Sequence, residues 1–132
     1  MKYIWMYLIS LAVFLAIDMV WLNFIAKALY QRELGYLMAD KFNLAAAFIF
    51  YAIFVAGLMY FSIYPAFVQQ SVLKAVLTGA FFGLVSYATY DLTNMATVRD
   101  WPLLITLVDL VWGATLGATT SSISYLIFKR LF

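Results

Sequence analysis

Three aspartates, Asp18, Asp91 and Asp109, interrupt stretches of sequence that are otherwise apolar enough to cross a bilayer. A charged side chain at the centre of a membrane helix is unfavourable by about 3 kcal/mol, and such residues usually face a protein interior or a wet cavity. Carboxyl groups in one poorly solvated site cannot all be ionised, so at least one is expected to hold a proton near neutral pH unless a cation is bound. The sequence therefore predicts an acidic site inside the membrane.

The absence of two residue types narrows the chemistry of this site. The chain has no cysteine and no histidine. Disulfides, iron–sulfur clusters and thiolate zinc sites are thus excluded, and the usual base at neutral pH is missing. Carboxyl, amide and hydroxyl groups remain, which suit hard cations or acid–base chemistry. We predict no metal centre and no cofactor, and a net charge of +2 without a run of Lys or Arg predicts no nucleic-acid partner.

The elements that must position the acids follow from composition and length. The chain is 67% hydrophobic and 11% charged, whereas about a quarter of residues in soluble domains are charged. About 20 apolar residues cross a bilayer as helix, and four stretches qualify, at about 3–25, 44–64, 72–93 and 103–128. Residues 27–41 repeat apolar positions at helical spacing, which predicts a short amphipathic helix in the membrane interface. We expect one all-α domain over residues 1–132, a bundle of four transmembrane helices with this interfacial helix between the first and second.

Four spans bring the three acids to one side of the membrane. The end of the first span, the end of the third and the start of the fourth lie in the same leaflet, and Asp18, Asp91 and Asp109 fall there. Other polar and aromatic residues fall there too, and Arg99 in the short third connection is the nearest basic partner. The candidate ligand- or proton-binding residues are Asp18, Asp91, Asp109, Asn94, Trp21, Trp112, Tyr87, Tyr90, Thr93, Asn23 and Arg99. Protonated aspartates that only hydrogen-bond helices together are the structural alternative.

Small residues recur at a spacing of four in the third and fourth spans. Gly79 and Gly83 lead to Asp91, and Asp109 leads to Gly113 and Gly117. Folding this pair of spans about residue 100 matches the two GxxxG motifs, which allow helix backbones to approach closely. The pattern favours a close antiparallel hairpin with two carboxyl groups near its connection. Glycines that merely relieve crowding against bulky neighbours are the alternative.

A shared pattern links the first and fourth spans. Asp18-Met-Val-Trp21 and Asp109-Leu-Val-Trp112 each put an acid and an indole on adjacent parts of one helix face. The indole could support a carboxylate, wall a cavity or face a cation. Because the two spans run in opposite directions, the match is either the trace of an inverted repeat or chance. Anchoring at the membrane interface is the other role open to these tryptophans.

These residues also carry a resemblance to a known family. The segments are Asp18-Met-Val-Trp21-Leu22, Tyr30 with Leu34-Gly35-Tyr36-Leu37, Tyr90-Asp91-Leu92-Thr93-Asn94-Met95-Ala96-Thr97 running to Trp101-Pro102, and Asp109-Leu-Val-Trp112-Gly113. Over essentially its whole length the chain resembles the bacterial predicted membrane proteins grouped as domain of unknown function 2177. The resemblance implies a small four-helix protein of the bacterial inner membrane. It implies no activity, ligand or catalytic residue.

Three kinds of function fit these features. The first is an acidic pocket that binds or translocates protons or a small cationic or amphiphilic ligand, and with only four spans such a protein is expected to be a homodimer. The second is a membrane-embedded acid–base enzyme acting on a lipid or isoprenoid, so enzymatic activity is left open. The third is an accessory subunit of a membrane complex. We expect a multi-pass protein of the inner membrane with both termini cytoplasmic, although the Lys and Arg counts on the two sides are equal.

Overall fold

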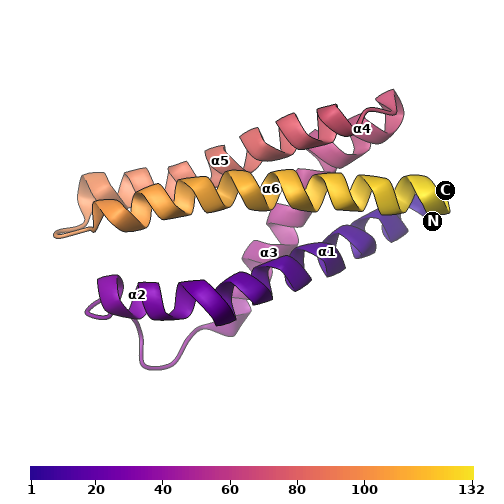
Figure 1. The fold of residues 1–132 in the computed structure, drawn as a ribbon. Coiled ribbons are helices and arrows are strands. Elements are labelled where there is room, and N and C mark those ends of the chain that lie inside the picture. Colours follow the sequence, from indigo (N-terminus) through magenta and orange to yellow (C-terminus); the bar gives the residue numbers. More distant parts are fainter.

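The computed structural model describes all 132 residues, and helices are its only regular elements (Figure 1). In chain order the elements are α1 (Lys2–Trp21), the π-helical turn η1 (Leu22–Ala26), α2 (Lys27–Leu34), α3 (Leu44–Leu58), the π-helical turn η2 (Met59–Ile63), α4 (Tyr64–Gln69), α5 (Val72–Thr97) and α6 (Leu103–Leu131). They join into four continuous helices that are long and apolar enough to cross a membrane. The expectation of an all-α fold with four such helices is confirmed.

The first helix is longer than the sequence suggested. It runs without a break from Lys2 to Leu34, because α2 continues α1 through η1. No glycine or proline occurs before Gly35, so nothing in this segment stops the helix. The short helix expected over residues 27–41 is therefore not a separate element, and it ends at Leu34. Its position in the membrane interface stays a prediction.

The second helix also passes its expected end. It begins at Leu44, after the N-cap residue Asn43, whose side-chain Oδ1 accepts a hydrogen bond from the Ala46 N–H at 3.1 Å, and it continues past Pro65 to Gln69. Proline lacks an N–H and crowds the preceding turn, and the wider π-helical turn η2 lies just before it. We attribute the continuation through Pro65 to this turn.

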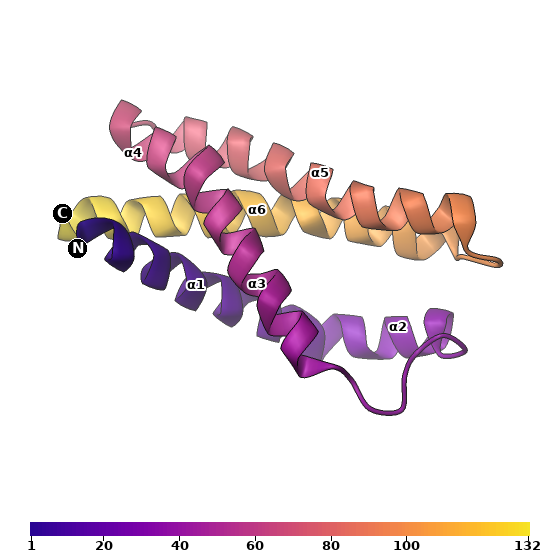
Figure 2. The same ribbon diagram turned by 180° about the vertical axis from the view of Figure 1, so that it is seen from behind.

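The last two helices form a close antiparallel hairpin. Figures 1 and 2 show α5 and α6 side by side along their length, connected by residues 98–102. A β-carbon added to Gly83 would collide with the backbone carbonyl of Gly113, and one added to Gly117 would collide with that of Gly79. The two backbones therefore approach more closely than any residue with a side chain would allow at these positions.

The remaining helices cover one side of this hairpin. Figure 2 shows α3 running diagonally across α1 and α6, and both termini lie at the end opposite the α5–α6 connection. The main apolar core joins α1, α3, η2 and α6. Its members are Met6, Phe14, Phe54, Val55, Leu58, Ile63, Leu116 and Phe128. The outer surface carries many exposed large apolar side chains, as expected where lipid is the solvent.

Candidate functional site

A cavity of about 490 Å³ lies in the half of the molecule nearest the α5–α6 connection. The cavity walls come from α1, η1, α2, α3, α5, α6 and two connecting segments. Half of its sixteen lining residues are aromatic, namely Trp21, Tyr30, Phe50, Tyr51, Tyr87, Tyr90, Trp101 and Trp112. The other lining residues are Asp18, Asp91, Asp109, Leu22, Leu34, Met38, Ala47 and Ser86. Three carboxyl groups and no basic side chain therefore face one aromatic hollow.

The three carboxyl groups differ in their burial and in their hydrogen-bond partners. Asp91 is completely buried, and neither of its carboxyl oxygens has a hydrogen-bond partner. Asp18 and Asp109 are 4% and 6% exposed. The Asp91 and Asp109 side chains are close enough to interact, which is the relation that the paired α5–α6 register predicts. A buried polar group without a partner is rare in proteins, so Asp91 is the group most in need of a ligand or a proton.

Asp109 has a partner from the far end of the first helix. The hydroxyl of Tyr30 on α2 donates a hydrogen bond to Oδ1 of Asp109. Tyr51 on α3 lies similarly beside the carboxyl of Asp18. Neither tyrosine was among the candidate residues. A separate interfacial helix over residues 27–41 would place Tyr30 away from the acids. Tyr51 lies in an apolar stretch, where nothing in the sequence distinguishes it from its neighbours.

The two Asp-x-x-Trp segments meet face to face. The rings of Trp21 and Trp112 stack with their centroids 4.4 Å apart and their planes inclined by 9°. Trp112 lies beside Asp18 and Trp21 beside Tyr30. Both indole N–H groups are buried and make no hydrogen bond inside the protein. The stack therefore forms an aromatic wall with two unused donors next to the carboxyl groups.

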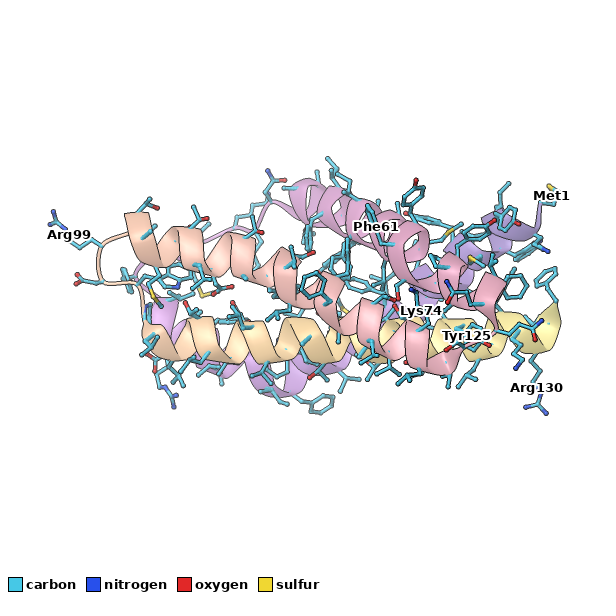
Figure 3. The ribbon with its side chains drawn as sticks, turned by 90° about the horizontal axis from the view of Figure 1, so that it is seen from above. Met1, Phe61, Lys74, Arg99, Tyr125 and Arg130 are labelled. Carbon is cyan, nitrogen blue, oxygen red and sulfur yellow. The ribbon has the colours of Figure 1, made fainter.

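The structure brings seven of the eleven candidate residues to this cavity and leaves four outside it. Asn23 donates from Nδ2 to the Met19 carbonyl of its own helix at 2.9 Å, and Thr93 is exposed on α5. Asn94 lies next to Tyr90 but does not line the hollow. Arg99 extends away from the bundle at its end (Figure 3). The only ion pair joins Arg32 to Glu33 at 3.2 Å on the surface, so no protein cation neutralises the three aspartates.

Two residues that line the cavity are also exposed on the outer surface. Phe50 of α3 and Tyr90 of α5 line it and are also exposed on the outer surface. At the end of the molecule, the Tyr36 hydroxyl donates to the Asp100 carbonyl at 2.6 Å and ties the turn after α2 to the α5–α6 connection. Part of the cavity lining is therefore exposed on the surface that carries the apolar side chains.

The arrangement of the lining groups limits the kinds of ligand that the cavity could hold. No three acidic side chains converge in a way that could hold a metal ion. The cavity supplies carboxyl groups, phenols and aromatic faces, which suit an organic cation or a proton better than a bare metal ion.

Comparison with known proteins gives a family and no activity. The family model described as "Predicted membrane protein (DUF2177)" matches residues 3–126. No curated protein and no solved structure matches the chain.

Proposed function

Because the chain belongs to the DUF2177 family of predicted membrane proteins and has four candidate spans, we propose its function from the cavity: it binds lipophilic organic cations inside the bilayer, as a step in their translocation. The observation that carries this proposal is the set of three buried carboxyl groups in a cavity with no basic side chain and a half-aromatic lining.

The charge of the cavity supports a cationic ligand. A carboxylate in a poorly solvated site is strongly destabilised unless a positive charge lies beside it. The lining contains no Lys or Arg that could supply this charge. A cation brought by a ligand would supply the missing charge. A ligand without positive charge would leave the carboxylates uncompensated.

The aromatic lining supports an organic cation over an inorganic one. Indole and phenol faces attract organic cations by about 0.5–2 kcal/mol per contact. Ca²⁺ and Mg²⁺ take six or more oxygen ligands, and no three acidic side chains of this cavity converge in a way that could hold a metal ion. A volume of about 490 Å³ also falls in the usual range for small-molecule sites, about 300–1,000 Å³.

Two exposed lining residues support entry from the lipid phase. Phe50 and Tyr90 line the cavity and are exposed on the outer surface, and amphiphilic cations concentrate among the acyl chains and headgroups. In this account the protein lies in the bacterial inner membrane with both termini cytoplasmic, α2 lies near the opposite interface, and two copies associate as a homodimer.

Binding of tetraphenylphosphonium tests this proposal. Equilibrium dialysis of the labelled cation against purified protein in lipid nanodiscs measures the affinity directly, and tetraphenylborate serves as an anion of the same shape. We expect saturable binding of the cation only, and at least about tenfold weaker binding by Asp91→Asn, since a lost charged contact is worth more than about 1.4 kcal/mol. Asp100→Asn is the matched control, because Asp100 is exposed outside the cavity and asparagine tolerates its left-handed backbone, φ 58°. Equal binding of both ions would remove the proposal.

One observation favours a second candidate, an acid–base enzyme acting on a lipid or isoprenoid. The Tyr30 hydroxyl and the Asp109 carboxyl form a proton donor–acceptor pair beside Asp91, an arrangement that can take up and deliver a proton. A lipid extract from cells expressing the protein should then contain a product that is absent with Asp109→Asn. Identical lipid profiles would dismiss this candidate.

A further inference from the structure

We propose that Asp91 carries a proton when the cavity is empty, and that each organic cation entering the cavity displaces this proton to solvent. The protein would then exchange cations for protons. This inference rests on the proposed binding function and adds a stoichiometry and a direction of coupling to it.

The position of Asp91 supports a bound proton. Its side chain is completely buried and both oxygens lack a partner. An ionised carboxylate there would be an uncompensated charge in a poorly solvated site, while the protonated form carries none. Asp109 differs because the Tyr30 hydroxyl already donates to it, which stabilises its ionised form. The proton therefore belongs to Asp91 rather than to Asp109.

The surroundings of Asp91 offer no other way to balance charge. The titratable groups that face the cavity from every packed helix are Asp18, Tyr30, Tyr51, Tyr87, Tyr90 and Asp109. All are acids or phenols, and the basic Arg99 lies outside at the end of the bundle (Figure 3). Positive charge can therefore reach the pair of Asp91 and Asp109 only as a proton or as part of a ligand.

The exchange step conserves charge. The O–H bond of Asp91 breaks as the cation arrives, the proton leaves to water, and the remaining carboxylate pairs with the cation. The net charge of the cavity is the same before and after. With Asp109 ionised, the pair carries a charge of −1 when it holds either the proton or the cation, and of −2 when it holds neither. In this proposal the cation pairs with the carboxylate of Asp91 itself, so that the cation and the proton compete for one group, which is the requirement for coupled exchange.

Proton release on binding tests the inference. Tetraphenylphosphonium is added to protein in weakly buffered detergent solution containing a pH indicator, and the bound cation is measured in parallel. We expect about one proton to be released per cation bound. We also expect the affinity for the cation to fall about tenfold for each unit by which the pH is lowered in the acidic range, as linkage of one proton to one ligand requires. Asp91→Asn should release no proton, while Asp91→Glu and Asp100→Asn should keep the release.

The outcomes separate the exchange from the binding function. If the natural protein binds the cation saturably but releases no proton, and its affinity does not depend on pH, then the exchange is overturned and the proposed function stays in place. No binding of the cation overturns both. Proton release that persists undiminished in folded Asp91→Asn overturns the assignment to Asp91. The measurements on the natural protein and on Asp91→Glu do not depend on whether the asparagine variant folds.

Discussion

The indole rings of Trp21 and Trp112 lie 4.4 Å apart between centroids and nearly parallel, although the two residues are 91 positions apart in the chain. Each tryptophan follows an aspartate of its own helix by three residues. The stack therefore joins α1 to α6 at the level of the acidic cavity and gives the cavity one aromatic wall.

Replacing one indole should weaken cation binding without unfolding the bundle. Trp112→Leu removes an aromatic face worth about 0.5–2 kcal/mol to an organic cation, so we expect tetraphenylphosphonium affinity to fall by roughly 2- to 30-fold. Equilibrium dialysis measures this independently of tryptophan fluorescence. Trp5→Leu is the control, because Trp5 is exposed on the terminal half of α1 and outside the cavity. An equal loss with both variants would contradict a role for the stack.

The hydrogen bond from Tyr30 to Asp109 should hold α2 in place. Tyr30→Phe leaves a buried carboxyl without its donor, which destabilises the protein by about 1–3 kcal/mol. We expect faster amide hydrogen exchange over Lys27–Leu34, since α2 packs chiefly on the neighbouring turn η1. Tyr60→Phe removes an exposed hydroxyl without a hydrogen bond in the protein and serves as the control. Unchanged exchange rates in α2 would show that other contacts fix this segment.

The close approach of α5 and α6 predicts a large penalty at Gly83. A β-carbon in Gly83→Ala meets the rigid Gly113 carbonyl, whereas one in Gly57→Ala meets only the movable ring of Phe82. Overpacking typically destabilises by about 1–3 kcal/mol, and we expect Gly83→Ala at or above the top of this range. The midpoint of thermal unfolding in detergent compares the two variants. A Gly83 variant as stable as the Gly57 variant would contradict the backbone contact.

Asp91 should be kept for function at the expense of stability. Burying a polar group without a hydrogen bond is unfavourable, and even a buried ion pair can often be replaced by apolar residues of similar volume with no loss of stability or a gain of about 1–4 kcal/mol. We therefore expect Asp91→Leu to raise the unfolding midpoint while it abolishes cation binding. Asp109→Leu should lower the midpoint, because it removes the acceptor of the Tyr30 hydroxyl. A marked loss of stability in Asp91→Leu would indicate a structural role instead.

The four long apolar helices, and the half of the bundle in which the acids lie, could be predicted from the sequence because both depend on length and polarity alone. The position of a residue along a helix does not give its direction around the helix. At about 100° per residue, Thr93 points about 160° away from Asp91 and Asn23 about 140° away from Asp18, so both miss the cavity that the acids line. Trp21 lies only about 60° from Asp18 and lines it. The helix end was harder to predict, because a segment without glycine or proline continued through a π-helical turn and carried Tyr30 to Asp109.

Photolabelling tests the central claim, that a lipophilic cation occupies the acidic cavity, more directly than any affinity. A triphenylphosphonium that carries a benzophenone group is irradiated with the protein in nanodiscs, and the adducts are located by mass spectrometry. The account predicts adducts on cavity residues such as Tyr87, Tyr90 and Trp112, suppressed by excess tetraphenylphosphonium and by Asp91→Asn. Adducts confined to outward-facing residues such as Phe24 and Phe81, and unaffected by the competitor, would contradict it.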